Sequence, residues 1–152
     1  MADIQHRVLF VCIHNSARSQ MAEAFLNKYG KDQFRAESAG IEPGKLNPNV
    51  IQVMREVGID LSQKGTQGVM DLFRKGRPYH AVITVCDAAS AERCPIFPGR
   101  VKRLAWSFPD PSSFTGSPEE SLNFTREVRD KIEKAIIEFV KEASSVAYWM
   151  QN

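Results

Sequence analysis

The feature that most restricts the fold of this chain is an unbroken apolar run, Val8 to Ile13, that leads directly into a short polar segment and then into a helical pattern. Continuous runs rich in β-branched residues are typical of strands buried on both faces, so we expect a strand at Arg7–Cys12. The helical pattern ends at Gly30, a residue type that commonly follows the last turn of a helix. A buried strand that passes straight into a helix predicts a parallel α/β fold.

The rest of the chain continues the alternation of strands and helices. Further strands are expected at Phe34–Ser38, Ala81–Cys86 and Val101–Trp106. The chain has no internal repeat and no linker rich in Gly or Ser, so we expect one domain over residues 1–152. Its predicted fold class is α/β, a three-layer sandwich around a four-stranded parallel sheet with the doubly wound order 2-1-3-4.

The sequence predicts the first residues of two helices. Asn47 followed by Pro48 is typical of an N-cap and the first helical residue, in a helix that ends before Gly58. The segment Ser117-Pro118-Glu119-Glu120 has the pattern of a capping box and opens the longest helix. Apolar residues recur along that helix at steps of three or four, and charged residues such as Arg129 are expected to face water.

Composition excludes several classes of protein. The six apolar residues of the longest run fall far short of the roughly 20 needed to cross a bilayer. Met1 to Gln5 lacks the pattern of a signal peptide, so we expect a cytoplasmic protein. The formal charge of +2 is too balanced to indicate nucleic-acid binding through net charge. Three cysteines cannot all pair, and in a reducing compartment they are more often buried residues, metal ligands or reactive thiols than a disulfide framework.

A candidate anion site lies between the first strand and the first helix. The sequence there is Cys12-Ile13-His14-Asn15-Ser16-Ala17-Arg18-Ser19. A strand-to-helix turn directs unpaired amide N–H groups and the positive end of the helix dipole at one point, which suits a tetrahedral oxyanion. The same field and Arg18 favour the thiolate of Cys12, and Arg18 can hold two anion oxygens at once. The alternative is that Cys12 is a buried thiol without chemistry.

Asp110, followed by Pro111, is the second candidate. It follows the fourth strand, and the carboxyl ends of parallel strands are where such sheets gather site residues. A carboxylic acid at this place could protonate an oxygen that leaves the anion as Cys12 attacks. Without the anion loop, an Asp-Pro pair would be read as a turn.

The other two cysteines form a third candidate. In the order 2-1-3-4, Cys12 and Cys86 end neighbouring strands about 4.8 Å apart, which is compatible with a disulfide between them. Seven residues, Asp87 to Arg93, separate Cys86 from Cys94, and this small, polar loop could carry Cys94 towards Cys86. The alternatives are incidental thiols and a zinc site formed by Cys12, His14, Cys86 and Cys94.

Several segments together resemble the thioredoxin-coupled arsenate reductases, which share the fold of low-molecular-weight protein tyrosine phosphatases. The matching segments are Val11 to Glu23, Ser38-Ala39-Gly40, Thr84-Val85-Cys86, Cys94-Pro95 and Asp110-Pro111. The resemblance implies reduction of arsenate to arsenite without a cofactor, with thioredoxin or a similar dithiol as partner. It implies that Cys12 attacks arsenate, Cys86 attacks Cys12, and Cys94 then attacks Cys86.

The resemblance also implies further roles around the loop. Arg18 and the residues from Ile13 to Ser19 would bind the oxyanion, and Asp110 would be the acid. Some family members bind potassium near this loop. Asn15, Glu23 and Ser38 fall at matching positions, which gives the expectation of a weak potassium site, whereas a further expected Asp is replaced by the segment Lys64-Gly65-Thr66-Gln67.

Two other functions compete with this interpretation. A phosphatase acting on phosphotyrosine or a small phosphoester needs Cys12, Arg18 and Asp110 but neither of the other cysteines. Phosphatases of this fold usually place tyrosines after the Asp-Pro pair, where this chain has Ser112-Ser113-Phe114. The other alternative is a non-catalytic redox sensor whose disulfide switches a partner surface. The apolar tail at Tyr148-Trp149-Met150 could serve that role, although docking on its own domain or disorder is the simpler expectation.

Overall fold

The computed structural model describes residues 5–150 and contains one four-stranded parallel sheet with the order β2-β1-β3-β4. The strands are β1 (His6–Cys12), β2 (Phe34–Gly40), β3 (Ala81–Thr84) and β4 (Lys102–Ala105). All four strands and their predicted spatial order are confirmed. The prediction about Met1 to Gln5 lies, except for Gln5, outside the described residues.

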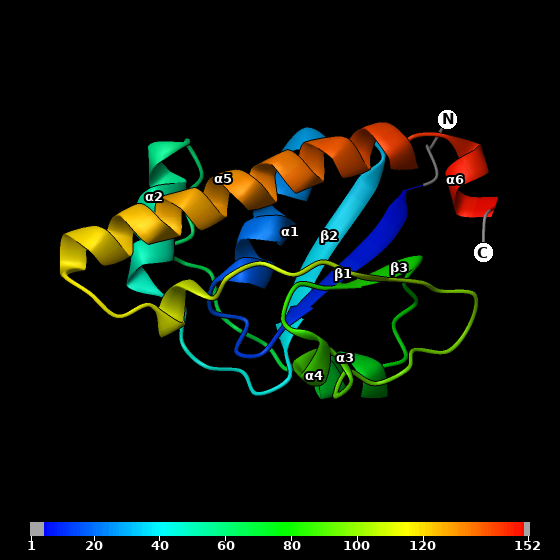
Figure 1. Ribbon diagram of the computed structural model, residues 1–152. Coiled ribbons are helices and arrows are strands. Elements are labelled where there is room, and N and C mark those ends of the chain that lie inside the picture. Colours follow the sequence, from blue (N-terminus) through cyan, green and yellow to red (C-terminus); the bar gives the residue numbers. More distant parts are fainter. Residues whose placement is uncertain (1–4, 151–152) are drawn as a thin grey trace.

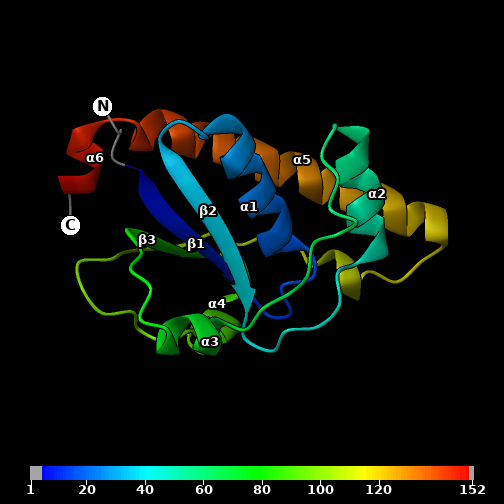
Figure 2. The same cartoon turned by 180° about the vertical axis from the view of Figure 1, so that it is seen from behind.

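Helices cover both faces of this sheet and produce three layers (Figures 1 and 2). One face carries α1 (Arg18–Tyr29), α2 (Pro48–Glu56) and the long α5 (Pro118–Ala143). The other face carries α3 (Val69–Arg74), whereas α4 (Ala88–Ala91) follows β3 at the carboxyl end of the sheet. A 3₁₀ turn, η1 (Pro111–Ser113), and a terminal helix, α6 (Val146–Met150), complete the elements.

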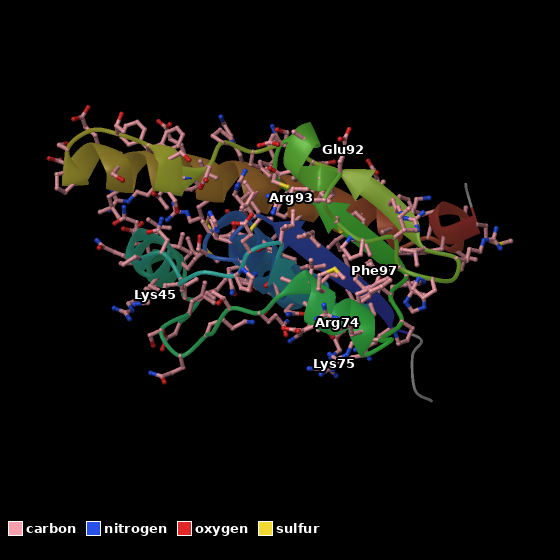
Figure 3. The ribbon with its side chains drawn as sticks, turned by 90° about the horizontal axis from the view of Figure 1, so that it is seen from below. Lys45, Arg74, Lys75, Glu92, Arg93 and Phe97 are labelled. Atoms are coloured by element: carbon pink, nitrogen blue, oxygen red, sulfur yellow. The ribbon has the colours of Figure 1, made fainter. Side chains whose placement is uncertain are left out.

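Alternate side chains of β1 point to opposite faces of the sheet and pack in two different hydrophobic clusters. Val8 and Phe10 are fully buried in the cluster beneath α1 and α5, and Leu9 and Val11 are fully buried in the cluster beneath α3. Phe97, from the loop before β4, completes the second cluster (Figure 3). Its ring lies 5.4 Å from that of Phe73 and 5.3 Å from that of Tyr79, both edge to face. The strand that leads to the candidate site is therefore held from both sides.

Both predicted helix caps are present. The Asn47 side chain accepts the amide of Asn49 at 2.8 Å, and Ser117 and Glu120 form the reciprocal capping box. The prediction that Arg129 faces water was wrong, because its guanidinium donates to the Val53 carbonyl at 2.9 Å and only 11% of its side chain is exposed. Helix α5 packs against both α1 and α2, and its Phe139 contacts Phe34 of β2, so its buried stripe is wider than the sequence pattern indicates.

The C-terminal segment docks on its own domain. Trp149 stacks on His6 with ring centroids 4.0 Å apart, and its indole Nε1 donates to the carbonyl of Ala143 at 2.8 Å. Helix α6 therefore lies beside the start of β1, at the end of the sheet opposite to the loops that follow the strands (Figure 1). Among the described residues, no helix is long and apolar enough to cross a membrane.

Candidate active site

The segment between β1 and α1 forms a loop whose carbonyl groups are directed outwards. The carbonyls of Cys12, Ile13 and His14 accept the amides of Ile41, Glu42 and Gly44, and the carbonyl of Ser16 accepts the amide of Asn47. In a trans peptide the N–H points away from the preceding carbonyl, so these bonds turn the amides of Ile13, His14, Asn15 and Ala17 towards the inside of the loop. The result is a cradle of N–H donors, as expected for an oxyanion site.

Two residues allow the loop to close this tightly. Asn15 adopts φ 56°, a left-handed conformation that Asn tolerates better than most residues. Gly40 lies directly beneath the loop, where an added Cβ would lie 2.8 Å from the Asn15 amide nitrogen and 2.9 Å from the Ile13 carbonyl oxygen. Any side chain at position 40 would therefore push the loop away from the end of β2.

Cys12 lies at the base of this loop with its sulfur close to two polar partners. Its Sγ lies 2.8 Å from the Ser19 hydroxyl and accepts the Asn15 amide at 3.2 Å. The residue is 2% exposed, so these contacts act on the sulfur with little screening by water. The sequence predicted the proximity of the loop amides and Ser19, and the structure brings them together.

Arg18 begins α1 and is almost fully buried, with 6% of its side chain exposed. Its Nη1 donates to the carbonyl of Phe108 at 3.2 Å, whereas its Nε is buried without an acceptor among residues 5–150. A buried, unsatisfied guanidinium N–H costs free energy unless an acceptor such as an anion oxygen meets it. The geometry of Arg18 therefore fits an oxyanion ligand.

Asp110 meets Arg18 from the other side of the site. Its Oδ2 lies 3.6 Å from Nη2 of Arg18, and its Oδ1 accepts the amide of Ser112 at 2.9 Å, which caps η1. The side chain remains 23% exposed. Asp110 therefore both caps a turn and places a carboxyl group beside the loop.

Cys86 follows β3, the strand that pairs with β1, and β1 ends at Cys12. The β1–β3 ladder runs to Val11 opposite Thr84, and the Val85 amide donates to the Val11 carbonyl at 2.9 Å, so Cys86 follows at the edge of the loop. Burial raises the pKa of the Cys86 thiol; nearby Arg18 opposes this effect, and Cys12 adds to it. Each of these neighbours belongs to the candidate site.

Cys94 lies near Cys86. Burial raises the pKa of Cys94 to about 11, and the proximity of Cys86 contributes to the shift. All three cysteines are free thiols in this structure. Arg93, the residue before Cys94, is labelled in Figure 3. It pairs with Glu42 of the loop after β2, and this ion pair joins the segment that carries Cys94 to the surroundings of the Cys12 loop.

A buried polar row supports the loop from behind. Asn15 Nδ2 donates to Ser19 at 2.8 Å and to Ser38 at 2.9 Å, and the Ser38 hydroxyl donates to Glu23 at 2.7 Å. The row ends at Lys64, whose Nζ lies 3.0 Å from Glu23 Oε2.

Two glutamines in this region were missed by sequence reasoning. Gln20 donates to the carbonyl and side-chain oxygens of Asn15 at 3.1 and 3.2 Å, and the Gln67 amide donates to Asn15 Oδ1 at 3.0 Å. The position of Gln20 in the first turn after the loop was the available signal.

Potassium does not fit the predicted donor set of Asn15, Glu23 and Ser38. Asn15 presents its NH₂ group to Ser38, and its oxygen is occupied by Gln20 and Gln67. The carboxylate of Glu23 already faces the ammonium of Lys64. For the zinc alternative, residues 5–150 contain no cluster of three or more His, Cys, Asp or Glu side chains that could hold a metal.

Comparison with known proteins shows the family to which this chain belongs. The family model of the low molecular weight phosphotyrosine protein phosphatases matches residues 7–147. An arsenate reductase of Bacillus subtilis is 41% identical over 134 residues, covering 88% of this chain and 94% of the relative. An arsenate reductase of Shouchella clausii is 40% identical over 135 residues, covering 88% and 94%.

Solved structures give the same result. An arsenate reductase in an oxidized state superposes with a TM-score of 0.75 at 27% identity, covering 90% of this chain and 98% of the other. A thioredoxin-dependent arsenate reductase of Corynebacterium glutamicum gives a TM-score of 0.69 at 26% identity, covering 93% of this chain and 62% of the other. With the fold, the anion loop and these relatives in agreement, the chain belongs to the low molecular weight phosphotyrosine protein phosphatase family.

Proposed function

We propose that this protein reduces arsenate to arsenite by a relay of three thiols, and that a thioredoxin-class dithiol restores the reduced enzyme. The observation that carries the proposal is the placement of Cys86 beside the anion loop of Cys12, with Cys94 close to Cys86. A phosphatase needs only the first of these thiols. The names of the relatives, arsenate reductases at about 40% identity, support the same reading.

In the first step, arsenate binds in the loop between Ile13 and Ser19, where the inward amides and the Arg18 guanidinium neutralise its charge. The Cys12 thiolate attacks arsenic. A hydroxyl group of arsenate leaves as water after it takes a proton from Asp110, whose carboxyl lies beside Arg18. The product is a covalent bond between sulfur and As(V).

In the second step, the Cys86 thiolate attacks the sulfur of Cys12. The S–As bond breaks, and its electron pair stays on arsenic, which is thereby reduced from As(V) to As(III) and leaves as arsenite. The two thiols have become one Cys12–Cys86 disulfide. Arg18 is near enough to lower the pKa of Cys86 against the effect of burial, so the same guanidinium assists both thiols.

In the third step, the Cys94 thiolate attacks Cys86 and releases the Cys12 thiolate. The Cys86–Cys94 disulfide that results is reduced by the external dithiol. The segment after α4 lies near the surface, because Cys94 is half-buried and Ile96, two residues further on, is 74% exposed. Reliance on three reduced thiols and such a partner suits a reducing compartment, so the proposal includes a cytoplasmic location.

Phosphoester hydrolysis is the second candidate, favoured by the family model and by the set of Cys12, Arg18 and Asp110. The rim after Asp110 does not favour an aromatic substrate. Phe114 stacks on Phe124 with centroids 4.7 Å apart, so this ring is used for internal packing. We therefore treat hydrolysis as a side activity of the same loop.

The test is a single turnover of the fully reduced protein with arsenate and no added thiol. The proposal predicts one arsenite released and two thiols lost per chain, with a disulfide found by peptide mapping. Phosphatase chemistry alone would leave all three thiols free. A redox sensor without catalysis would form no arsenite.

A further inference from the structure

We propose that Lys64 is a positioning residue whose ammonium replaces an alkali cation and, through a row of hydrogen bonds, orients the groups that stabilise the Cys12 thiolate. The row runs from Lys64 through Glu23, Ser38, Asn15 and Ser19. The inference rests on the proposed function only in taking Cys12 as the nucleophile.

The orientation of the Asn15 amide is fixed by its partners. Its Oδ1 accepts from Gln20 Nε2 at 3.2 Å and from the Gln67 amide at 3.0 Å, both of which can only donate. The NH₂ group must then face the two hydroxyls of Ser38 and Ser19 and donate to both. No rotation of the amide satisfies all four neighbours in another way.

This orientation decides where the hydroxyl hydrogens point. Ser38 accepts from Asn15 and therefore directs its one hydrogen to Glu23 Oε1 at 2.7 Å. Ser19 accepts from Asn15, which leaves its own hydrogen free to donate to the sulfur of Cys12, 2.8 Å away, when that sulfur is a thiolate. A thiolate can only accept, so the row is arranged for the charged form of Cys12.

Lys64 provides the charge that holds the far end of the row. Glu23 is only 8% exposed, and a buried carboxylate without a counter-charge is costly. Lys64 Nζ lies 3.0 and 3.2 Å from its two oxygens. With this ammonium in place, Glu23 stays ionised and accepts the hydrogen of Ser38. The Ser38 hydrogen therefore points at Glu23 and away from Asn15.

The end of the row is open to small cations. Glu23 and Lys64 both line a polar cavity of about 450 Å³ that also includes Lys31 and Gln67. If Lys64 were shortened, a monovalent cation from solution could reach the carboxylate of Glu23. This arrangement gives the proposal a test that depends on neither arsenate nor a reductant.

The test measures alkylation of Cys12 by iodoacetamide in a background with Cys86→Ser and Cys94→Ser, so that one thiol reacts. Lys64→Ala, Lys64→Arg and the matched control Lys31→Ala are compared across pH, in potassium chloride and in choline chloride at equal ionic strength. Lys31 lines the same cavity and has the same charge, but its ammonium is not bonded to Glu23. Thermal unfolding and circular dichroism check the fold of each variant.

We expect Lys64→Ala to move the midpoint of the pH–rate profile upwards by about one unit, which lowers the rate at neutral pH about tenfold. Lys64→Arg and Lys31→Ala should keep the parent profile. Potassium should restore part of the rate in Lys64→Ala and have no effect when Lys64 is present.

Two results would overturn the proposal: an unchanged profile in folded Lys64→Ala, or acceleration of the parent by potassium. If Lys64→Ala fails to fold, Lys64→Gln takes its place and the same shift is required of it. A failure of arsenate reduction with this shift present would count against the proposed function and leave the role of Lys64 standing.

Discussion

The guanidinium of Arg18 and the carboxyl of Asp110 lie 3.6 Å apart, measured from Nη2 to Oδ2, although 92 positions separate them in the sequence. Arg18 belongs to the first turn of α1, and Asp110 caps the turn after β4. The contact places the proposed anion ligand next to the proposed proton donor. The first two predictions follow from this pair.

Arg18→Lys is expected to lower arsenate turnover by about 10² to 10³, the usual loss when one donor to a developing oxyanion is removed. A lysine ammonium cannot both reach the Phe108 carbonyl and replace the buried Nε of Arg18. Steady-state kinetics with arsenate, and phosphate protection against alkylation of Cys12, measure the effect. Unchanged kinetics would show that Arg18 does not hold the anion.

Asp110→Asn is expected to slow the attack of Cys12 on the anion by about 10² to 10⁴, because the amide cannot supply a proton. Folding should be preserved, since the amide oxygen can still accept from the Ser112 amide. Phosphoesters with basic leaving groups should suffer more than nitrophenyl phosphate. A loss below about threefold with every substrate would reduce Asp110 to a turn residue.

Cys12→Ser is expected to abolish both arsenate reduction and phosphoester hydrolysis. The contacts from Ser19 and the Asn15 amide stabilise a charged sulfur, and an alcohol does not ionise in this range. Assays of arsenite and of nitrophenol release measure the two activities. Arsenite formation at the parent rate would remove Cys12 from the mechanism.

The release of arsenite in a single turnover should become faster as pH rises from 7 to 8. Burial raises the pKa of Cys86, so below that pKa its thiolate fraction grows about tenfold per pH unit. Rapid-quench measurement of arsenite in the Cys94→Ser variant isolates this step. A rate independent of pH over this interval would mean that deprotonation of Cys86 does not control it.

Much of the fold was predictable because its signals are local. The apolar run before Cys12, the cap at Asn47 and the capping box at Ser117 each act within a few residues, and each is present. The strand ends were less accurate. The third strand ends at Thr84, two residues earlier than expected, although the Val85 amide still donates to the Val11 carbonyl. The second strand continues to Gly40, which lies directly beneath the loop.

The part of the candidate site that lies in one short segment, such as Cys12 and Arg18, was predictable because its residue types and spacing indicate the chemistry directly. The supporting row was not, because it depends on contacts between distant segments. Lys64 in the sequence indicated only that an expected carboxylate was absent, whereas the structure shows its ammonium on Glu23. Arg129 likewise has the spacing of a solvent-facing residue, and only the packing of α5 on α2 explains its burial.

The central claim is the order of the thiol relay, and peptide mapping after one turnover with arsenate tests it most directly. Cys94→Ser should release one arsenite and trap a Cys12–Cys86 disulfide, because Cys86 follows the strand beside the Cys12 loop. Cys86→Ser should release no arsenite, and both variants should keep phosphoester hydrolysis. Normal release of arsenite by Cys86→Ser, with a Cys12–Cys94 disulfide in the map, would contradict the relay.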